Sequence, residues 1–247
     1  MNASVKRYLR QYAAKYETTD FLKGDPSCSM HQVEGGANKE ATAFIASCLS
    51  LGSRKQFLPK IQSLLDCAAG DIDSWIRKGG YREIFSQNND ACFYRFFTYA
   101  IMYRFFEAYK RLLDEYGTLG EYVKELSNRD ARKAISVICE YFSVAGVDGL
   151  IPKNTQSACK RICMFLRWMA RGNSPVDLGL WQDFIDCGSL VIPLDTHVLQ
   201  QSVRLGLIEK ANSSMNTAVQ LTEKLAEVFP KDPLKGDFAL FGHGVNA

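Results

Sequence analysis

The chain has 247 residues, of which 47% are hydrophobic, and its formal net charge is only +3 at pH 7. This length is enough to bury a sizeable core, as one large domain or two small, closely packed ones. The low charge excludes a strongly basic tail, so any nucleic-acid surface must be a local basic patch. No run approaches the roughly eighteen apolar residues of a membrane span, and the charged N-terminal segment lacks the apolar core of a signal peptide, which together predict a cytoplasmic protein.

Helical periodicity extends through most of the chain. Clusters of Gly, Pro, Asn and Asp separate the periodic segments, and no alternating strand pattern bounded by hairpin turns occurs. The sequence therefore predicts an all-α fold, with residues 20–37 as the longest irregular stretch and residues 145–155 as the turn between two halves. Apolar residues recur at helical spacing in residues 3–16, 38–51, 54–68, 93–116, 129–144, 156–171, 196–205 and 214–229.

The eight cysteines are scattered through apolar helical contexts, and no C-x-x-C pair occurs. Because no signal peptide is expected, they are predicted to be reduced, buried thiols rather than a disulfide framework. Cys159 and Cys163 lie four positions apart but have no nearby partners at metal-ligand spacing. We expect no structural zinc, no iron–sulfur cluster and no other cofactor.

The turn LGSRKQ at residues 51–56 joins two predicted helices and is the first candidate contact surface in chain order. It presents Ser53, Arg54, Lys55 and Gln56. Arg and Lys at an exposed turn suit contact with phosphates. An ordinary solvated helix start explains the same residues, so both interpretations stay open.

The predicted helix at 156–171 has two contrasting faces, because successive residues advance by about 100°. One face is an ordinary core stripe, made of Ile162, Phe165, Leu166 and Met169. The other is either a solvated basic face or a surface that meets phosphate, and it carries Lys160, Met164, Arg167 and Arg171. Lys160 stands in the first turn of this helix, after a polar turn that includes Lys153 and has no acidic residue.

A second helix start follows in VIPLDTHVLQQSVRLGL, residues 191–207. Pro193 disfavours helix at the residue before it, and Asp195 is placed to cap the helix by accepting backbone N–H bonds. The helix dipole favours its charged form by about 0.3–1 kcal/mol, so the carboxylate can also stabilise a cation. A mere cap and a partner for the Lys160 nucleophile are both open interpretations. His197 is expected to be a packed or half-exposed helix residue.

Four segments carry a family resemblance. They are GDPSCSMHQ at 24–32, KEATAFIASCLSLGSRKQFLPKIQSLL at 39–65, CKRICMFLRWMAR at 159–171 with VDLGLW at 176–181, and IPLDTHV at 192–198 with DPLKGDFALFGHGV at 232–245. On them the chain resembles the bacterial domain-of-unknown-function 2400 family over nearly its full length. The Lys-bearing helix and the Asp-Thr-His-Val helix start also resemble the helix-hairpin-helix DNA glycosylase superfamily, nearest its archaeal 8-oxoguanine DNA glycosylase branch.

The glycosylase resemblance implies a two-lobed helical bundle whose cleft holds a nucleotide rotated out of double-stranded DNA. Lobe A would comprise about residues 1–36 and 150–247, and lobe B about residues 37–149. The implied activity is that of a base-excision repair glycosylase and lyase acting on a damaged base, with 8-oxoguanine as the nearest analogue's substrate.

The resemblance also implies roles for individual residues. Lys160 would be the nucleophile and Asp195 its electrostatic and base partner. Lys153 and Arg167 would join the 53–56 turn in contacting nucleic acid. The pocket candidates are His197, Phe241 and His243.

Three departures from the glycosylase pattern are visible. No glycine lies between Pro152 and Lys160, where the usual hairpin has a Gly-x-Gly turn whose bare N–H groups approach a phosphate. The connection to Asp195 is also longer than in endonuclease III, and the four-cysteine loop of that enzyme is missing, since Cys187 is the last cysteine. The expected hairpin is therefore a divergent one.

Two other functional interpretations fit the same sequence. A non-catalytic helical nucleic-acid-binding protein on this scaffold would use Lys160 only as a phosphate contact. A protein-interaction module with no nucleic-acid role fits the modest net charge.

Overall fold

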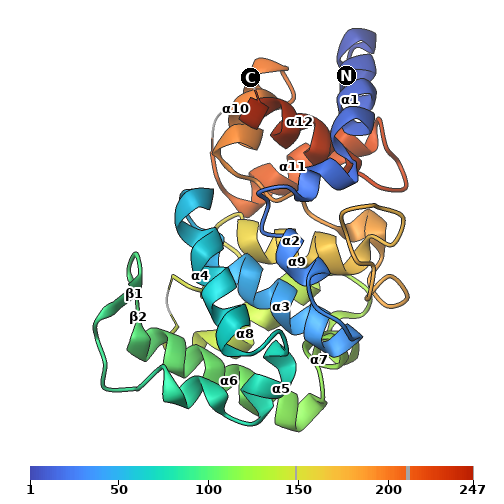
Figure 1. Ribbon diagram of the computed structural model, residues 1–247. Coiled ribbons are helices and arrows are strands. Elements are labelled where there is room, and N and C mark those ends of the chain that lie inside the picture. The colour runs from blue at the N-terminus through green and yellow to red at the C-terminus, as the bar shows by residue number, and fades with distance from the viewer. Residues whose placement is uncertain (148, 210–211, 247) are drawn as a thin grey trace. The chain divides into compact units, whose positions relative to one another are not determined.

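The computed structural model of the chain describes residues 1–147, 149–209 and 212–246, with residues 243–246 described by their backbone alone. The structure is mostly helical (Figure 1), which confirms the predicted all-α class. It divides into two compact units, each of which draws on separate stretches of the chain. Unit 1 comprises Met1–Lys23, Arg129–Ile135 and Thr155–Ala247, and unit 2 comprises Gly24–Asn128 and Ser136–Asn154.

Unit 2 is built around α3 (Gly36–Leu49), in which residues 40–49 are all buried. This helix packs against α2, α4, α5 and α7, and Phe44 lies at the centre of an aromatic cluster with Phe105, Tyr109 and Phe142 of later helices. The other elements of this unit are α2 (Cys28–His31), α4 (Arg54–Cys67), α5 (Ile72–Arg77), a short 3-10 turn at Gly80–Glu83, α6 (Tyr99–Tyr116), α7 (Leu119–Ser127) and most of α8 (Ala131–Ser143).

A short hairpin precedes α6, where the periodicity predicts helix from residue 93. Strands β1 (Cys92–Tyr94) and β2 (Phe97–Thr98) pair antiparallel, with Tyr94 opposite Phe97. Arg95 at the turn has a positive φ of 55°, a conformation that no helix contains. The hydroxyl of Thr98 then caps α6 by accepting from the Ile101 N–H at 3.2 Å. The predicted start of this helix is therefore wrong by six residues.

Unit 1 is built around α9 (Lys160–Ala170) and α12 (Lys235–Asn246). Residues 162–170 of α9 are all buried, including Arg167 on the face predicted to be basic. α12 packs against both α1 (Ala3–Tyr16) and α10 (Thr196–Arg204) (Figure 1). The unit is completed by α11 (Met215–Ala226) and short 3-10 turns at Thr19–Leu22 and Cys187–Ser189.

The cysteines are only partly where the sequence predicts them. All eight are free thiols, and four of them are buried. Cys67 and Cys92 are exposed, because both stand at the ends of elements on the surface of unit 2. Within the part of the chain that the structure describes, no helix combines the length and apolar character needed to cross a membrane.

Candidate active site

Lys160 is the first residue of α9, so the helix predicted over residues 156–171 starts four residues later than expected, and Lys160 stands in its first turn as predicted. Just before it, Ser157 forms an isolated antiparallel bridge with Ser214, and the Ala158 N–H donates to the Ser213 carbonyl at 3.2 Å. Cys159 then turns the chain into the helix with a left-handed φ of 46°. These backbone contacts fix the point at which α9 starts, and therefore the position of the Lys160 Cα atom.

Asp195 is the N-cap of α10, which confirms the predicted cap. Its Oδ1 accepts from the Val198 N–H at 2.9 Å. The residues before it, 190–194, are all buried, so the approach to the cap is anchored in the core. The cap uses one carboxylate oxygen and leaves the other available.

The two helix starts bring these side chains together. The Lys160 Nζ lies 3.9 Å from the Asp195 Oδ2, and the two side chains are 33% and 15% exposed. This separation is within ion-pair range but longer than a hydrogen bond, so no direct hydrogen bond joins the amine to the carboxylate. Asp195 therefore caps α10 through one oxygen and faces the Lys160 ammonium with the other.

Unit 1 also contains a buried network of arginine and acidic side chains. Arg167 Nε donates to the Asp177 Oδ1 at 3.2 Å, and Arg167 Nη1 also bonds Asp237. Arg171 binds Asp232 through two nitrogens, at 2.9 and 2.7 Å, and bonds Asp177 as well as Glu17 at 2.6 Å. The network ties α9 to the chain that follows it, to α12 and to the end of α1.

The network corrects the prediction for the basic face of α9. The side chains of Arg167 and Arg171 are only 4% and 2% exposed, so neither lies on a solvated or phosphate-facing surface. A buried guanidinium must be paired, and acidic residues from distant segments supply the partners. Arg167 is thus occupied by Asp177 and Asp237 and cannot make the expected nucleic-acid contact.

The network carries more negative than positive charge. Two guanidinium groups face four carboxylates, those of Glu17, Asp177, Asp232 and Asp237. Burial raises the pKa of Asp237 to about 6, Arg167 opposes the rise, and the negative charge of Asp195 adds to it. Asp195 therefore lies close enough to sense this network electrostatically.

The pocket candidates fall into two groups. His197 is exposed in the first turn of α10, and its ring lies 6.4 Å from the Phe241 ring of α12 in an edge-on arrangement. Phe241 also contacts Phe21, with ring centroids 6.0 Å apart. The side chain of His243 lies outside the described residues. The structure thus places His197 at the same helix start as Asp195, with Phe241 of α12 next to its ring.

The other expected contacts lie in unit 2. Ser53 is the N-cap of α4 without a side-chain cap bond, and Arg54 pairs with Asp25 at 3.3 Å. Lys55 and Gln56 are exposed in the first turn of α4, and Lys153 is exposed in the segment that ends this unit. The residue types and their exposure remain compatible with phosphate contact.

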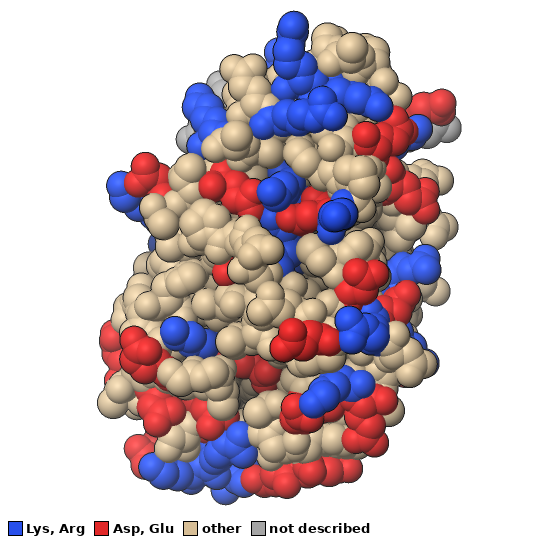
Figure 2. Space-filling model, turned by 90° about the vertical axis from the view of Figure 1, so that its right-hand side faces the viewer, with Lys and Arg blue, Asp and Glu red and all other residues tan. Residues whose placement is uncertain are grey.

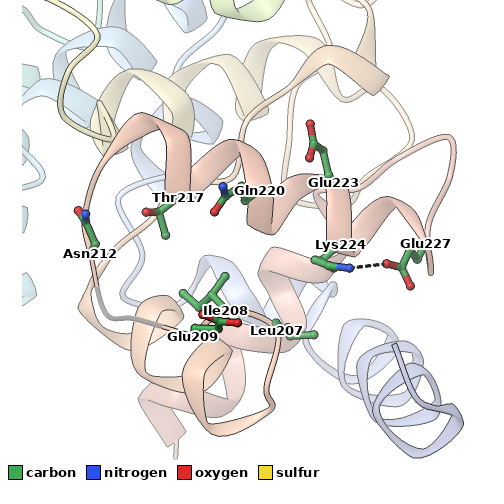
Figure 3. A pocket seen from close by; sticks show the side chains of 9 residues that line it. All are labelled: Leu207, Ile208, Glu209, Asn212, Thr217, Gln220, Glu223, Lys224 and Glu227. Atoms are coloured by element: carbon green, nitrogen blue, oxygen red, sulfur yellow. Dashed lines mark hydrogen bonds and ion pairs between the residues drawn. The ribbon is translucent and has the colours of Figure 1, made fainter.

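A cavity of about 600 Å³ in unit 1 does not belong to this site (Figure 3). Its charged lining is mainly acidic, with Glu209, Glu223 and Glu227 against Lys224, whose ammonium bonds Glu227 at 3.1 Å. A lining of this charge disfavours phosphate ligands. The remaining lining residues are Leu207, Ile208, Asn212, Thr217 and Gln220.

The fold and the site together define a mostly helical protein in which two helix starts place a lysine amine beside a largely buried carboxylate. The family described as "Protein of unknown function (DUF2400)" matches residues 25–246, and the chain belongs to this family. The family membership predicted from the four segments is thereby confirmed. No curated protein and no solved structure matches the chain.

Proposed function

We propose that the protein is a DNA base-excision glycosylase and lyase, with Lys160 as the nucleophile and Asp195 as its base and electrostatic partner. The observation that carries the proposal is the 3.9 Å approach of the Lys160 amine to the Asp195 carboxylate. A nucleophilic amine next to a proton acceptor is the arrangement that covalent catalysis by lysine requires. The resemblance to helix-hairpin-helix glycosylases gives the substrate class, a damaged base in double-stranded DNA.

The reaction needs a neutral amine at the sugar carbon C1′. Asp195 accepts a proton from the Lys160 ammonium, and the freed lone pair forms a bond to C1′ while the bond from C1′ to the base breaks. The electron pair of that bond leaves with the base, which takes up a proton. Ring opening of the sugar then gives a Schiff base between Lys160 and C1′, the intermediate of the lyase step.

The surroundings of Asp195 favour this division of roles. The carboxylate is 15% exposed and held by the cap bond to Val198, so its orientation is fixed before a substrate arrives. A preorganised anion of this kind stabilises the positive charge that develops on the sugar as the base departs. The amine, which is not hydrogen-bonded to Asp195, keeps the freedom to move from Asp195 to C1′.

Borohydride trapping tests the proposal, because reduction converts the Schiff base into a stable covalent complex. The wild-type protein is incubated with duplexes that contain 8-oxoguanine or an abasic site. We expect a trapped complex that Lys160→Ala abolishes and Lys160→Arg does not restore, since a guanidinium is not nucleophilic. Asp195→Asn keeps a cap but no base, and we expect base release to slow by about 10²–10⁴-fold.

A control variant separates chemistry from folding. Arg161 neighbours Lys160 in α9, and Arg161→Ala should leave trapping intact. Salt-dependent binding of the duplex without any trapping would reject the enzyme and favour the non-catalytic nucleic-acid-binding protein. Absence of both binding and trapping would favour a protein-interaction module.

A further inference from the structure

Helix α1 carries an exposed basic face. This face includes no residue of the Lys160 site or of the 53–56 turn. Its sequence, ASVKRYLRQYAAKY, contains four cations and no acidic residue. Arg7, Arg10 and Lys15 are exposed, whereas Leu9 and Ala13 on the opposite face are buried. Figure 2 shows Lys and Arg side chains gathered over this helix, at the top of the face that it displays. The helix is therefore held by its apolar side and presents its cations outward.

Three of the four cations of α1 have no acidic partner in the part of the chain that the structure describes. Among the described residues, no carboxylate lies within ion-pair distance of Arg7, Arg10 or Lys15, and Lys6 alone of the four reaches one, Glu227, at 4.0 Å. Glu17, the acidic residue next to the helix, is occupied by the buried Arg171. Elsewhere in the described chain, Lys110, Lys124 and Lys224 each pair with a carboxylate on their own helix or directly after it.

Two further features organise the face. Lys15 lies 5.7 and 5.2 Å from the ring centres of Tyr12 and Tyr16, and these cation–π contacts hold its ammonium at the surface. Arg204, exposed at the end of α10, is close enough to oppose the rise in the pKa of Tyr8 that burial causes. A second helix of unit 1 thus adds a fifth cation beside the face.

The spacing of the cations fits a strand of nucleic acid. A helix rises about 1.5 Å per residue, so Arg7 and Lys15 are about 12 Å apart along the axis. A DNA strand carries one phosphate per about 3.4 Å of duplex axis, so a face of this length spans several phosphates. Arginine and lysine are the residues that neutralise phosphates in protein–DNA contacts.

A membrane surface is a poorer fit. A helix that lies on a bilayer inserts large apolar side chains from the face that carries or flanks its cations. In the described part of the chain, the exposed large hydrophobic residues are Phe96, Leu126, Val144, Leu180 and Val203, none of which is on α1. The apolar side of this helix is already occupied by its packing against α12.

We propose that the exposed face of α1, with Arg7, Arg10 and Lys15, is a phosphate-contact surface that binds the backbone of double-stranded DNA. The inference rests on the proposed function only for its choice of DNA, and it does not depend on catalysis at Lys160. The contact is independent of base sequence, since every cation of the face would meet backbone phosphates.

The salt dependence of duplex binding tests this surface. Binding of a labelled duplex of about 20 base pairs is followed by fluorescence anisotropy between about 50 and 200 mM salt. In Arg7→Gln/Arg10→Gln, we expect the slope of log affinity against log salt to fall in magnitude by about 2, because each removed cation leaves one phosphate with its counterion. Arg7→Lys/Arg10→Lys keeps both charges and should restore most of the wild-type slope.

The matched control is Lys124→Gln/Lys224→Gln, which removes the same charge from two side chains that are each 52% exposed and paired with a glutamate. An equal fall of the slope in this control would overturn the inference, because it would reflect net charge alone. An unchanged slope in Arg7→Gln/Arg10→Gln, or no duplex binding by the wild type, would overturn it too. The inference would also be overturned if Arg7→Gln/Arg10→Gln weakened binding to phosphatidylserine vesicles but left duplex binding unchanged. If only the proposed catalysis fails, trapping is absent but the slope change remains.

Discussion

Removal of Arg171 should strongly destabilise unit 1. Its side chain is 2% exposed and bonds Asp177, Asp232 and Glu17. The Asp177 side chain is fully buried, so Arg171→Met leaves it with Arg167 as its remaining cation. Breaking a buried ion pair from one side costs about 3–5 kcal/mol, against a total unfolding free energy of about 5–15 kcal/mol for a typical domain.

Urea unfolding followed by tryptophan fluorescence measures this loss. Trp168 and Trp181 lie in unit 1 and Trp75 lies in unit 2, so a Trp75→Phe background makes the signal specific for unit 1. We expect the free energy of unfolding at pH 7 to fall by about 3–5 kcal/mol. Arg132→Met, which alters an exposed cation of the same unit, should change it by less than about 0.5 kcal/mol.

The pH dependence of the deficit separates charge from packing. Buried carboxylates without their cation have pKa values above those of the unfolded chain, so they contribute stability at low pH that is lost as the pH rises through the folded-state pKa. The deficit of Arg171→Met should therefore be largest at pH 7 and shrink towards pH 5. A loss below about 1 kcal/mol at pH 7, or a deficit that does not change with pH, would show that the guanidinium acts mainly by filling space.

Three further predictions concern the same unit. Burial raises the pKa of Asp237 to about 6 from its ordinary 3.8. The unfolding free energy of the wild type should therefore fall by up to about 3 kcal/mol relative to that of Asp237→Asn as the pH rises from about 4 to 6. The same pH dependence of the unfolding free energy in both proteins would contradict this. Asp195→Ala should lower the unfolding free energy by about 0.5–2 kcal/mol because the helix cap is removed, and Asp195→Asn by much less, so equal losses in urea titrations would argue against the cap. Gly242→Ala places a Cβ against the Tyr16 ring, and we expect a cost of about 1–3 kcal/mol, seen as a lower Tm by circular dichroism and refuted by an unchanged or higher one.

The helices are the part of the fold that the sequence predicts best. Periodicity places helices at 3–16, 54–68 and 196–205, and the structure has Ala3–Tyr16, Arg54–Cys67 and Thr196–Arg204. The start of α10 is explained by local chemistry, since Pro193 disfavours helix before it and Asp195 can cap the helix after it. Such rules act over a few residues and need no knowledge of the tertiary structure.

The hairpin before α6 escapes prediction because its residues are ambiguous. Phe93, Tyr94 and Phe97 suit a strand and an amphipathic helix equally well. The left-handed backbone at Arg95 decides between the two, and it is rare for a residue that is not glycine. A β-turn signal such as Asn-Gly would reveal the hairpin, and the sequence has none there.

The burial of Arg167 and Arg171 also escapes prediction, because their partners come from distant segments. Asp237 lies 70 residues beyond Arg167, and Glu17 lies 154 residues before Arg171. One signal is present: the α9 sequence is apolar almost all round between these arginines and Lys160, which is typical of a buried helix. Charges on such a helix must be paired, so acidic partners can be sought in the segments after it.

The candidate site, too, depends on contacts between segments that are distant in the sequence. The sequence identifies Lys160 and Asp195 as two helix starts, but their approach depends on the way α9 and α10 pack within unit 1. No local pattern encodes a contact between side chains 35 positions apart. The resemblance to a known family supplies this pairing as an expectation, and its chemical role stays a prediction until trapping is measured.

The discontinuity of unit 1 has a consequence during protein synthesis. α1 ends at Tyr16, and its packing partner α12 begins only at Lys235. At about 5–20 residues per second, the ribosome takes on the order of 10–40 s to make the intervening chain. Throughout this interval the first helix lacks the helix against which it mainly packs. In nascent chains, the basic segment of α1 should therefore stay incompletely folded after the residues of unit 2 have been synthesised and can already pack against one another.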